Sequence, residues 1–577
     1  MTLHPAFEVP TSELPTSEVP TFDIREIPFS VRGSWLNLSP VVALHSHADA
    51  VHLVSHRNGM HAVLRCEPLT AADVAWVADA ATFSWRTDAG AVTAVFDGLR
   101  TLRLRGDGVG LRLADAAGGL TPFTGTYLFT DPVDGSAVFT SYETGRRYRV
   151  TSLAGSLVVE GDEALGVADR AVLLGADGAA WEATLEEIDA AAAPFAVTRT
   201  FDEVVAANSL TFATYLEAIA PWRSERTPAA GLAAYVLWSA TVSPEGLATR
   251  ESVLMSMHWM DKLWSWDHCF NALALAAGEP DAALDQFLAP FDHQDATGAI
   301  PDSVTHSEVL YNYVKPPIHG WALRRMRARA SRALTVAELT EIHDRLSRWS
   351  SFWLDRRRVP GHALPYYQHG NDSGWDNSTT FDRDRVIESP DLAAFLSIQL
   401  EVLADLSDEL GLPSQEWRTH SDELRAALLG DLWTGTELVA VGARSGTVST
   451  ATSLLNLLPL VLGERLPGEV RDVLGARLEQ HLTDWGPATE PVDSPHYEDD
   501  GYWRGPIWAP STALIENGLR VSGLVDLADT VSARFRALCE KSGFAENFDA
   551  RTGAGLRDRA YTWTAAVYLL LAADAAD

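Results

Sequence analysis

The segment SPDLAAFLSIQLEVLADLSDELGLP, residues 389–413, decides the fold of the larger part of the chain. Ser389 and Pro390 are typical of a helix start, where a side-chain oxygen can cap free amides and a proline needs no amide partner. Gly411 and Pro413 end the helix. Large apolar side chains recur three or four positions apart, at Leu392, Phe395, Leu396, Leu400 and Leu403. The segment predicts a long helix whose apolar face packs against other helices.

Segments of the same kind recur through the second half of the chain. Helical spacing of apolar residues is found near 230–240, 267–278, 335–354, 415–430, 452–464, 511–520, 525–541 and 560–574. The polar linkers between these segments carry tryptophans, carboxylates and amides. This pattern predicts one large helical domain, with candidate functional residues in the linkers at the helix ends.

The first third of the chain has a different pattern. In LRTLRLRGDGVGLRLADA, residues 99–116, Leu102 and Leu104 alternate with arginines, and Leu111 and Leu113 repeat the alternation after Gly-Asp-Gly. A period of two on both sides of a turn predicts a β-hairpin. Further short apolar segments are separated by Gly, Asp and Pro, which favours an antiparallel sandwich.

The expected fold class is therefore α+β with two domains, an N-terminal antiparallel β-sandwich-like domain followed by a helical domain. Residues 8–22 contain the imperfect repeat EVPTS-ELPTS-EVPTF, which is typical of an extended mobile tail. We expect four parts: a tail at 1–27, a β-rich domain at 28–200, a helical connection at 201–224 and the helical domain at 225–577.

The composition limits the partners of this protein. A net charge of −33 disfavours nucleic acid and anionic membrane surfaces, both of which need a positive footprint. No apolar run approaches the roughly 20 residues of a membrane span. The sequence predicts no nucleic-acid or membrane partner, and whether the protein forms a homo-oligomer is left open.

Cysteine and histidine usage limits the chemistry in a similar way. Cys66, Cys269 and Cys539 are widely spaced and form no Cys-x-x-Cys pair, and the histidines form no His-Glu-x-x-His pattern. The N-terminus has neither the basic nor the apolar region of a secretory signal. We expect a cytoplasmic protein with no cofactor and no metal site in the mechanism, and a structural cation near Asp499–Asp500 stays open.

Five linkers in the helical half share one composition, in which aromatic rings stand beside carboxylates and amides at helix ends. They are DKLWSWDHCFNALALA (261–276), HQDATGAIPDSV (293–304), GNDSGWDNST (370–379), EDDGYWRGPIWAPSTALIENGL (498–519) and GFAENFDARTGAGLRDRAYTW (543–563). Flat amphipathic rings suit the faces of sugars, and glycosidic hydrolysis needs two carboxyl groups. Such a series predicts a pocket for a neutral polyhydroxylated substrate at one end of the helical domain.

The order of these motifs resembles the clan that joins trehalases with glycoside hydrolase family 63, which includes α-glucosidases and mannosylglycerate hydrolases. GNDSGWDNST resembles the signature Glu-Ser-Gly-Trp-Asp-x-Ser, with Asp372 in place of the usual Glu, and YWRGPIW resembles a second signature. The similarity covers roughly 225–575. It implies an (α/α)6 barrel and an inverting mechanism, with Asp376 as general acid and Glu546 as general base. We expect Asp372 to tune a hydrogen bond only.

The resemblance also implies a set of residues that line the sugar subsite: Trp264, Trp266, Asp267, Gln294, Trp375, Trp503, Arg504 and Trp508. Other roles are open for several of them. Trp266 and Trp508 could be core residues, Asp267 could cap the helix that follows it, and Arg504 could pair with an acid in the wall.

The sequence therefore predicts an inverting, exo-acting α-glycosidase for small glycosides or oligosaccharides. An α-glucoside is the first choice of substrate, an α-mannoside such as mannosylglycerate the second and trehalose the third. Two alternatives stay open, an inverting phosphorylase, in which phosphate replaces the base-activated water, and an inactive sugar-binding protein. A phosphorylase would tolerate the loss of Glu546.

Overall fold

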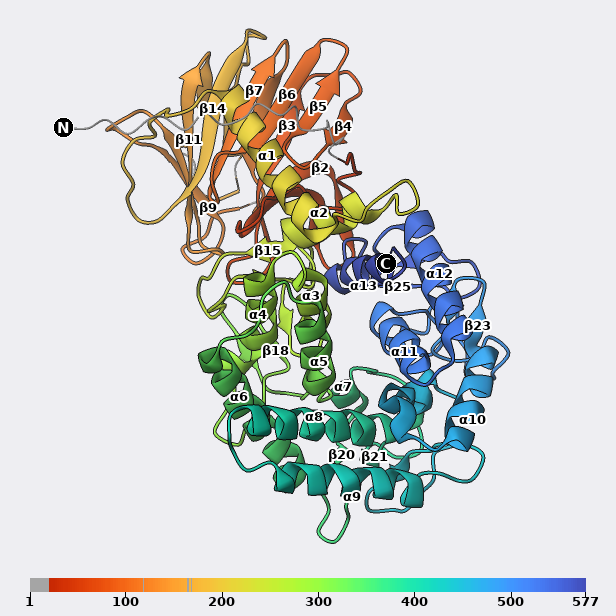
Figure 1. Ribbon diagram of the computed structural model, residues 1–577. Coiled ribbons are helices and arrows are strands. Elements are labelled where there is room, and N and C mark those ends of the chain that lie inside the picture. Colours follow the sequence, from red (N-terminus) through yellow and green to blue (C-terminus); the bar gives the residue numbers. More distant parts are fainter. Residues whose placement is uncertain (1–19, 118, 163–165, 168, 577) are drawn as a thin grey trace, which may run out of the picture.

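The computed structural model describes residues 20–117, 119–162, 166–167 and 169–576. A β domain built from the first third of the chain stands on a ring of helices built from the rest (Figure 1). The expected fold class, an antiparallel β domain followed by an (α/α)6 barrel, is confirmed.

The β domain consists of two antiparallel sheets. The six-stranded sheet has the order β1 (Leu36–Ala43), β2 (Ser46–Ser55), β3 (His61–Leu69), β8 (Gly110–Asp115), β13 (Ala171–Leu174) and β12 (Leu157–Glu160). The eight-stranded sheet has the order β4 (Ala75–Ala78), β5 (Phe83–Thr87), β6 (Gly90–Phe96), β7 (Thr101–Asp107), β14 (Trp181–Ile188), β11 (Arg147–Ala154), β10 (Ala137–Ser141) and β9 (Thr126–Thr130). Their inner faces share one apolar core.

The hairpin predicted over residues 99–116 is wrong. Both strands exist, but β7 pairs with β6 and β14, whereas β8 pairs with β3 and β13 in the other sheet. Leu104 and Leu111 nevertheless reach the same core from opposite layers. Alternation shows which face of a strand is buried and does not show which strand is its partner.

Six helical elements form a closed inner ring, in which each contacts the next and the last contacts the first. In order around the ring they are α3 (His268–Leu275), α5 (His319–Arg329), α8 (Pro390–Glu409), η3 (Leu454–Arg465), α11 (Ala509–Val521) and α13 (Thr562–Asp574). Six outer helices pack on them: α2 (Ala230–Ala240), α4 (Pro280–Leu288), α6 (Val336–Arg356), α9 (Gln415–Asp431), α10 (Gly468–Leu478) and α12 (Val525–Ser542).

The predicted helix near 452–464 differs from the structure, because η3 is a 3-10 helix. Pro459 has no amide hydrogen for the helical ladder, and Gly463 has a non-helical conformation with φ of 59°. In α8, by contrast, the predicted start and end are present, with Pro390 in the first turn and Gly411 at φ of 69°. The Ser389 hydroxyl binds the Asp391 carboxylate and caps no amide.

Part of the predicted tail belongs to the core. Ile24 and Ile27 are buried, and the Phe22 ring stacks on Tyr235 with centroids 4.4 Å apart. The remainder of the predicted tail, up to residue 19, lies outside the described residues. The predicted connection at 201–224 contains α1 (Phe201–Ile219), which packs on β6 of the eight-stranded sheet through Val95.

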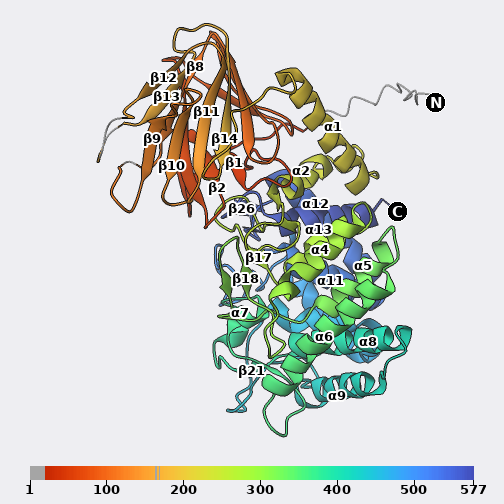
Figure 2. The ribbon, with the colours of Figure 1, turned by 90° about the vertical axis from the view of Figure 1, so that its left-hand side faces the viewer.

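The linkers singled out in the sequence lie along one side of the barrel. Figure 2 shows β17 (Leu263–Trp264), β18 (Ser303–Val304), α7 (Gly370–Ser373) and β26 (Gly555–Leu556) on that side. Two of these segments, β17 and β18, pair directly. In the described part of the chain, every helix is too short or too polar to cross a membrane.

Candidate active site

Asn377 joins two of the linkers that carry the sequence signatures. Its side-chain amide donates a hydrogen bond to the Gly501 carbonyl at 3.0 Å, and its side-chain oxygen accepts one from the Trp503 amide at 2.9 Å. Both bonds join segments that are more than a hundred residues apart in sequence. They fix the loop of Asp376 against the loop of Tyr502.

Tyr502 lies beside both predicted catalytic carboxyls. Its hydroxyl is hydrogen-bonded to Asp376, and the pKa of Tyr502 is raised well above its usual value by burial and by the charges of Asp376 and Glu546. The residue has φ of 64°, a left-handed conformation that is uncommon for a residue with a side chain. Residues held in such conformations cluster at functional sites, so this strain agrees with a role for the loop in the site.

Asp376 is recessed among protein atoms yet reachable from solvent, since its side chain is 29 % exposed. Burial raises its pKa, while the Lys315 ammonium, 3.9 Å away, and the Tyr502 hydrogen bond lower it. A carboxyl that is partly desolvated and still accessible can keep a proton and deliver it to a bound ligand.

Glu546 is 4 % exposed. Burial and the negative charges of Asp558 and Asp376 raise its pKa to about 8, and the Arg557 guanidinium lowers it. Because the charge of Asp376 contributes to the raised pKa of Glu546, the two carboxyls lie near each other although they are far apart in sequence. Ionisable groups that perturb one another in this way are typical of functional sites.

Asp558 keeps a negative charge next to Glu546. Its carboxylate accepts hydrogen bonds from the Ser256 hydroxyl at 2.6 Å and from His258 Nδ1 at 2.9 Å, and these partners lower its pKa. Its backbone carbonyl also accepts the Glu546 amide at 2.7 Å. Asp558 therefore positions the segment of Glu546 and raises the energy of the ionised Glu546 carboxylate.

Lys315 is the buried cation of the site and was not predicted from the sequence. Its ammonium lies 3.2 Å from the Asp302 carboxylate and donates a hydrogen bond to the Asn371 carbonyl at 2.8 Å. Together with its contact to Asp376, it ties the linkers 293–304 and 370–379 to one point. The nearby carboxylates raise its pKa against the effect of burial, so Lys315 is charged.

Asp267 lies in the same group of charges, and it does not cap α3 with its side chain. Burial raises its pKa to about 8, and Lys315 lowers it. One of its carboxylate oxygens is buried and has no hydrogen-bond partner among the described residues. A buried oxygen without a partner is costly unless a ligand supplies the missing hydrogen bond, which suits a sugar hydroxyl.

Most of the predicted sugar-facing tryptophans lie inside the wall of the barrel. Trp503 lies between Trp375 and Trp508, with ring centroids at 4.6 and 4.0 Å. All three rings are buried, and so is Trp266, which packs edge-on against Trp563. The core reading of Trp266 and Trp508 agrees with this placement. These rings support the linkers from behind.

Trp264 is only half-buried, and its ring centroid lies 5.5 Å from the Lys315 ammonium. Of the predicted tryptophans, it is the one with a recorded contact to the group of charges described above. Its contact with a sugar stays a prediction.

Two further predicted polar residues brace the loops. Gln294 donates hydrogen bonds to the carbonyls of Gly298 and Arg345, and Arg504 pairs with Asp382 and with the Asn377 carbonyl. The structure does not bring either side chain into contact with Asp376 or Glu546. Arg504 thus forms the acid pair that was left open in the sequence analysis.

Asp372 accepts hydrogen bonds from the Val314 and Gln368 amides and from Arg357 at 2.8 to 3.1 Å. It is almost fully buried. The substitution of Asp for the usual Glu therefore falls on a residue that holds the loop before Asp376.

Tyr561 is another residue that sequence reasoning missed. It is buried, and burial together with the charges of Glu546 and Asp267 raises its pKa well above the usual value.

The described residues contain no group of three or more His, Cys, Asp or Glu arranged to hold a metal ion. The arrangement can transfer protons and accept hydrogen bonds from hydroxyls.

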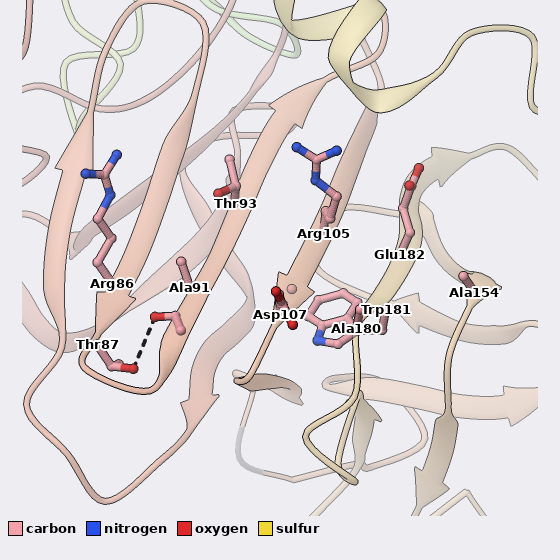
Figure 3. A pocket seen from close by; sticks show the side chains of 12 residues that line it. Arg86, Thr87, Ala91, Thr93, Arg105, Asp107, Ala154, Ala180, Trp181 and Glu182 are labelled. Carbon is pink, nitrogen blue, oxygen red and sulfur yellow. Dashed lines mark hydrogen bonds between the residues drawn. The ribbon is translucent and has the colours of Figure 1, made fainter.

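A cavity lies on the β domain, outside the barrel that carries these carboxyls. This groove has a volume of about 770 Å³ and lies on the eight-stranded sheet. Figure 3 shows Arg86, Arg105 and Glu182 among its lining residues. Arg105 pairs with Asp202 of α1, and Glu182 pairs with Arg103. The charges of Arg105 and Glu182 are thus satisfied within the protein, and we assign the groove no chemistry.

Comparison with known proteins places the chain in a family. Residues 260–564, just over half of the chain, match the family described as mannosylglycerate hydrolase MGH1-like glycoside hydrolase domain. A mannosylglycerate hydrolase of Rubrobacter radiotolerans is 25 % identical over 402 residues, covering 53 % of this chain and 89 % of that protein.

Solved structures agree on the fold. The family 63 mannosylglycerate hydrolase of Thermus thermophilus, in complex with glucose, has a TM-score of 0.53 at 20 % identity and covers 59 % of this chain and 98 % of that one. A bacterial glucoamylase with acarbose has a TM-score of 0.62 at 11 % identity and covers 95 % of this chain and 93 % of that one. The predicted resemblance is confirmed. The chain belongs to the mannosylglycerate hydrolase MGH1-like family and is an inverting glycoside hydrolase built on an (α/α)6 barrel.

Proposed function

We propose that this protein hydrolyses an α-glycoside whose leaving group is a small organic acid, with mannosylglycerate as the first candidate. Asp376 protonates the glycosidic oxygen, and Glu546 deprotonates the water that attacks the anomeric carbon from the opposite face. The observation that carries the proposal is the shared environment of these two carboxyls. Both raise the pKa of Tyr502, and the charge of Asp376 raises the pKa of Glu546.

The protonation states fit the roles of Asp376 as acid and Glu546 as base when the two carboxyls together hold one proton. An inverting enzyme works while its acid is protonated and its base is ionised. Burial raises the pKa of both groups, and the pKa of Glu546 is about 8. The working form, in which Asp376 holds the proton and Arg557 stabilises the ionised Glu546, is one of the two singly protonated forms of the pair.

Two of the remaining site residues, Asp267 and Trp264, bind and orient the sugar. The unpartnered oxygen of Asp267 is suited to accept a hydroxyl hydrogen, and Trp264 offers an accessible ring next to Lys315. The recessed site and its few accessible groups favour one terminal sugar, as an exo-acting enzyme requires.

The choice of substrate follows the relatives. The Rubrobacter protein and the Thermus structure are both named for mannosylglycerate hydrolysis, so we place that glycoside first. The Thermus structure holds glucose, and a glucoside of the same leaving group comes second. The glucosidase specificity that the sequence analysis placed first stays a prediction, and trehalose comes last.

The test is a panel of α-mannosides, α-glucosides and trehalose, with release of free sugar as the readout. Proton NMR follows the anomer that appears first. We expect hydrolysis of a glycerate α-glycoside with the β-anomer released first. Retention of configuration, or no release of sugar from any member of the panel, would contradict the proposal.

Phosphorolysis is the second candidate reaction, and Glu546 decides between the two. A phosphorylase needs no base carboxylate, because phosphate itself attacks the anomeric carbon. Glu546 is nevertheless buried beside the charged Asp558, which costs stability. A phosphorylase would gain no catalytic base from this arrangement. Turnover that requires phosphate would favour the second candidate, and binding without turnover would favour an inactive sugar-binding protein.

A further inference from the structure

The β1–β2 hairpin of the N-terminal domain bends over the barrel. From Ser39 to Val41 the first strand advances two residues, while the paired residues on the second strand go from His52 to His47. Pro40 lies in this irregular stretch and cannot donate to the ladder. Extra residues on one strand bend a hairpin, and such bulges often re-aim side chains next to active sites.

The tip of this hairpin reaches a loop of the barrel. The His45 ring packs on the Trp259 ring with centroids 4.7 Å apart, and neighbouring Leu44 is 62 % exposed. At the root of the hairpin, Asn37 donates a hydrogen bond to the Met257 carbonyl at 2.7 Å. His56 next to it binds Asp261 at 3.0 Å. The hairpin therefore contacts the loop Ser256–Lys262 both at the hairpin tip and at the hairpin root.

The loop Ser256–Lys262 in turn forms part of the wall of the site. His258 binds Asp558, which neighbours Glu546 in space, and the Lys262 ammonium lies 5.8 Å from the centroid of the Trp264 ring. The Lys315 ammonium lies 5.5 Å from the centroid of the same ring. The loop thus stands between the N-terminal hairpin and the residues that surround the two carboxyls.

Lys262 is a cation without a partner among the described residues. Its ammonium makes no ion pair and no hydrogen bond there, and it lies over the Trp264 ring. The other two lysines are satisfied, Lys315 by aspartates and Lys541 by the Thr552 carbonyl. In a chain of net charge −33, an anionic ligand is repelled at long range, so its binding needs a local unpaired cation.

We propose that the loop Ser256–Lys262 and the β1–β2 hairpin tip form the leaving-group subsite, in which Lys262 selects a carboxylate-bearing leaving group. This inference rests on the proposed function and adds the residues that determine its specificity. It also gives the N-terminal domain a role in substrate choice, since the family match begins at residue 260 and leaves the hairpin outside it.

The test compares two glycosides of the same sugar, one with glycerate and one with glycerol as the leaving group. They differ by one carboxylate. For the wild type we expect a higher kcat/KM on the glycerate glycoside. Lys262→Gln is expected to lower the ratio of the two kcat/KM values roughly ten- to a hundredfold through KM, the range for a hydrogen bond to a charged group, and Lys262→Arg to restore much of it.

Two further variants separate this role from general damage. Lys541→Gln removes a lysine that also lies over a tryptophan, Trp485, and is expected to leave the ratio unchanged. His45→Ala is expected to weaken inhibition by free glycerate severalfold while inhibition by the free sugar stays the same.

The possible outcomes distinguish a failure of this inference from a failure of the proposed function. A wild type that hydrolyses both glycosides equally well, or a Lys262→Gln variant that keeps the wild-type ratio, would overturn this inference and leave the proposed function standing. Weaker inhibition by free sugar in His45→Ala would show that the hairpin supports the whole site, against a leaving-group role. A wild type that hydrolyses neither glycoside would overturn the proposed function and this inference with it.

Discussion

The groove on the β domain and the group of carboxyls in the barrel differ in how their charges are satisfied. The groove is wide and open, and Arg105 and Glu182 along it have ion-pair partners. The barrel site holds buried carboxyls at Asp267 and Glu546, whose pKa values are raised to about 8. Desolvated groups held near neutrality cost stability and can move protons, so perturbed carboxyls mark the site better than cavity volume does.

The largest expected effect in this comparison comes from the base. Glu546→Gln is expected to lower kcat on a glycerate glycoside by about 10² to 10⁴, the usual contribution of a general base. The measurement is steady-state kinetics with and without inorganic phosphate. Activity that survives only when phosphate is present would instead favour phosphorolysis.

The same variant tests what the site costs in stability. The pKa of the folded Glu546 lies above its ordinary value, so the wild type loses stability as pH rises from about 4.5 to about 8. Gln carries no charge, so we expect a higher free energy of unfolding for the variant at pH 8 and no gain at pH 4. A variant that is less stable than the wild type at pH 8 would contradict this account.

Removing the central cation comes next. Lys315→Gln leaves Asp267, Asp302 and Asp376 without their common counter-charge, and we expect a loss of about 3–5 kcal/mol in the free energy of unfolding at pH 8. The loss should shrink as pH falls, because the carboxyls then take up protons. Urea denaturation at pH 8 and pH 5 measures both.

The exposed Lys541 supplies the control for that experiment. Lys541→Gln should change the free energy of unfolding by about 0.5 kcal/mol or less. Equal losses in the two variants, or a loss in Lys315→Gln that grows at low pH, would rule out the counter-charge role.

A smaller effect is expected on the pH dependence. The pair Asp376–Glu546 loses its last proton near pH 8, so kcat/KM of the free enzyme should fall above about pH 8. The Arg557 guanidinium lowers the pKa of Glu546, and Arg557→Gln should therefore move this basic limb to higher pH. The measurement is the pH profile of kcat/KM.

Arg551 is a matched control. It pairs with Asp499 and lies over Tyr497, as Arg557 pairs with Asp500 and lies over Tyr502. Arg551→Gln should leave the basic limb in place. If both variants shift the limb by the same amount, general electrostatics of the surface explain the shift and the specific role of Arg557 is wrong.

The smallest expected effect is in the groove. Arg86→Gln changes an exposed side chain on the sheet face, and kcat/KM should stay within about twofold of the wild type. A large loss of activity in this variant would show that the two regions are coupled, which the comparison above denies.

An element of the fold could be predicted from the sequence where the residues that determine it lie within one short segment. The helix from Pro390 was predictable because its start, apolar face and end lie within one segment. The partners of β7 and β8 were not, since alternation carries no information on the neighbouring strand. Pro459 and Gly463 were the local signals that could have warned of a 3-10 helix at η3.

The same holds for the site. The motifs singled out the linkers of Asp376 and Glu546, but they could not show which way a ring points, so buried Trp375 and Trp503 were taken as sugar-facing. Lys315 had a signal that was overlooked. It is one of only a few lysines in a chain whose cations are almost all arginines, and it comes shortly after a predicted carboxylate linker.

The most direct measurement of the central claim compares Asp376→Asn on two α-glycosides of the same sugar, the glycerate glycoside and the fluoride. Fluoride departs without a proton donor, whereas the glycerate oxygen needs one. We predict that kcat/KM falls by about 10² to 10⁴ on the glycerate glycoside and stays within about tenfold of the wild type on the fluoride. Equal losses on both, or full activity on the glycerate glycoside, would contradict the assignment of Asp376 as the acid.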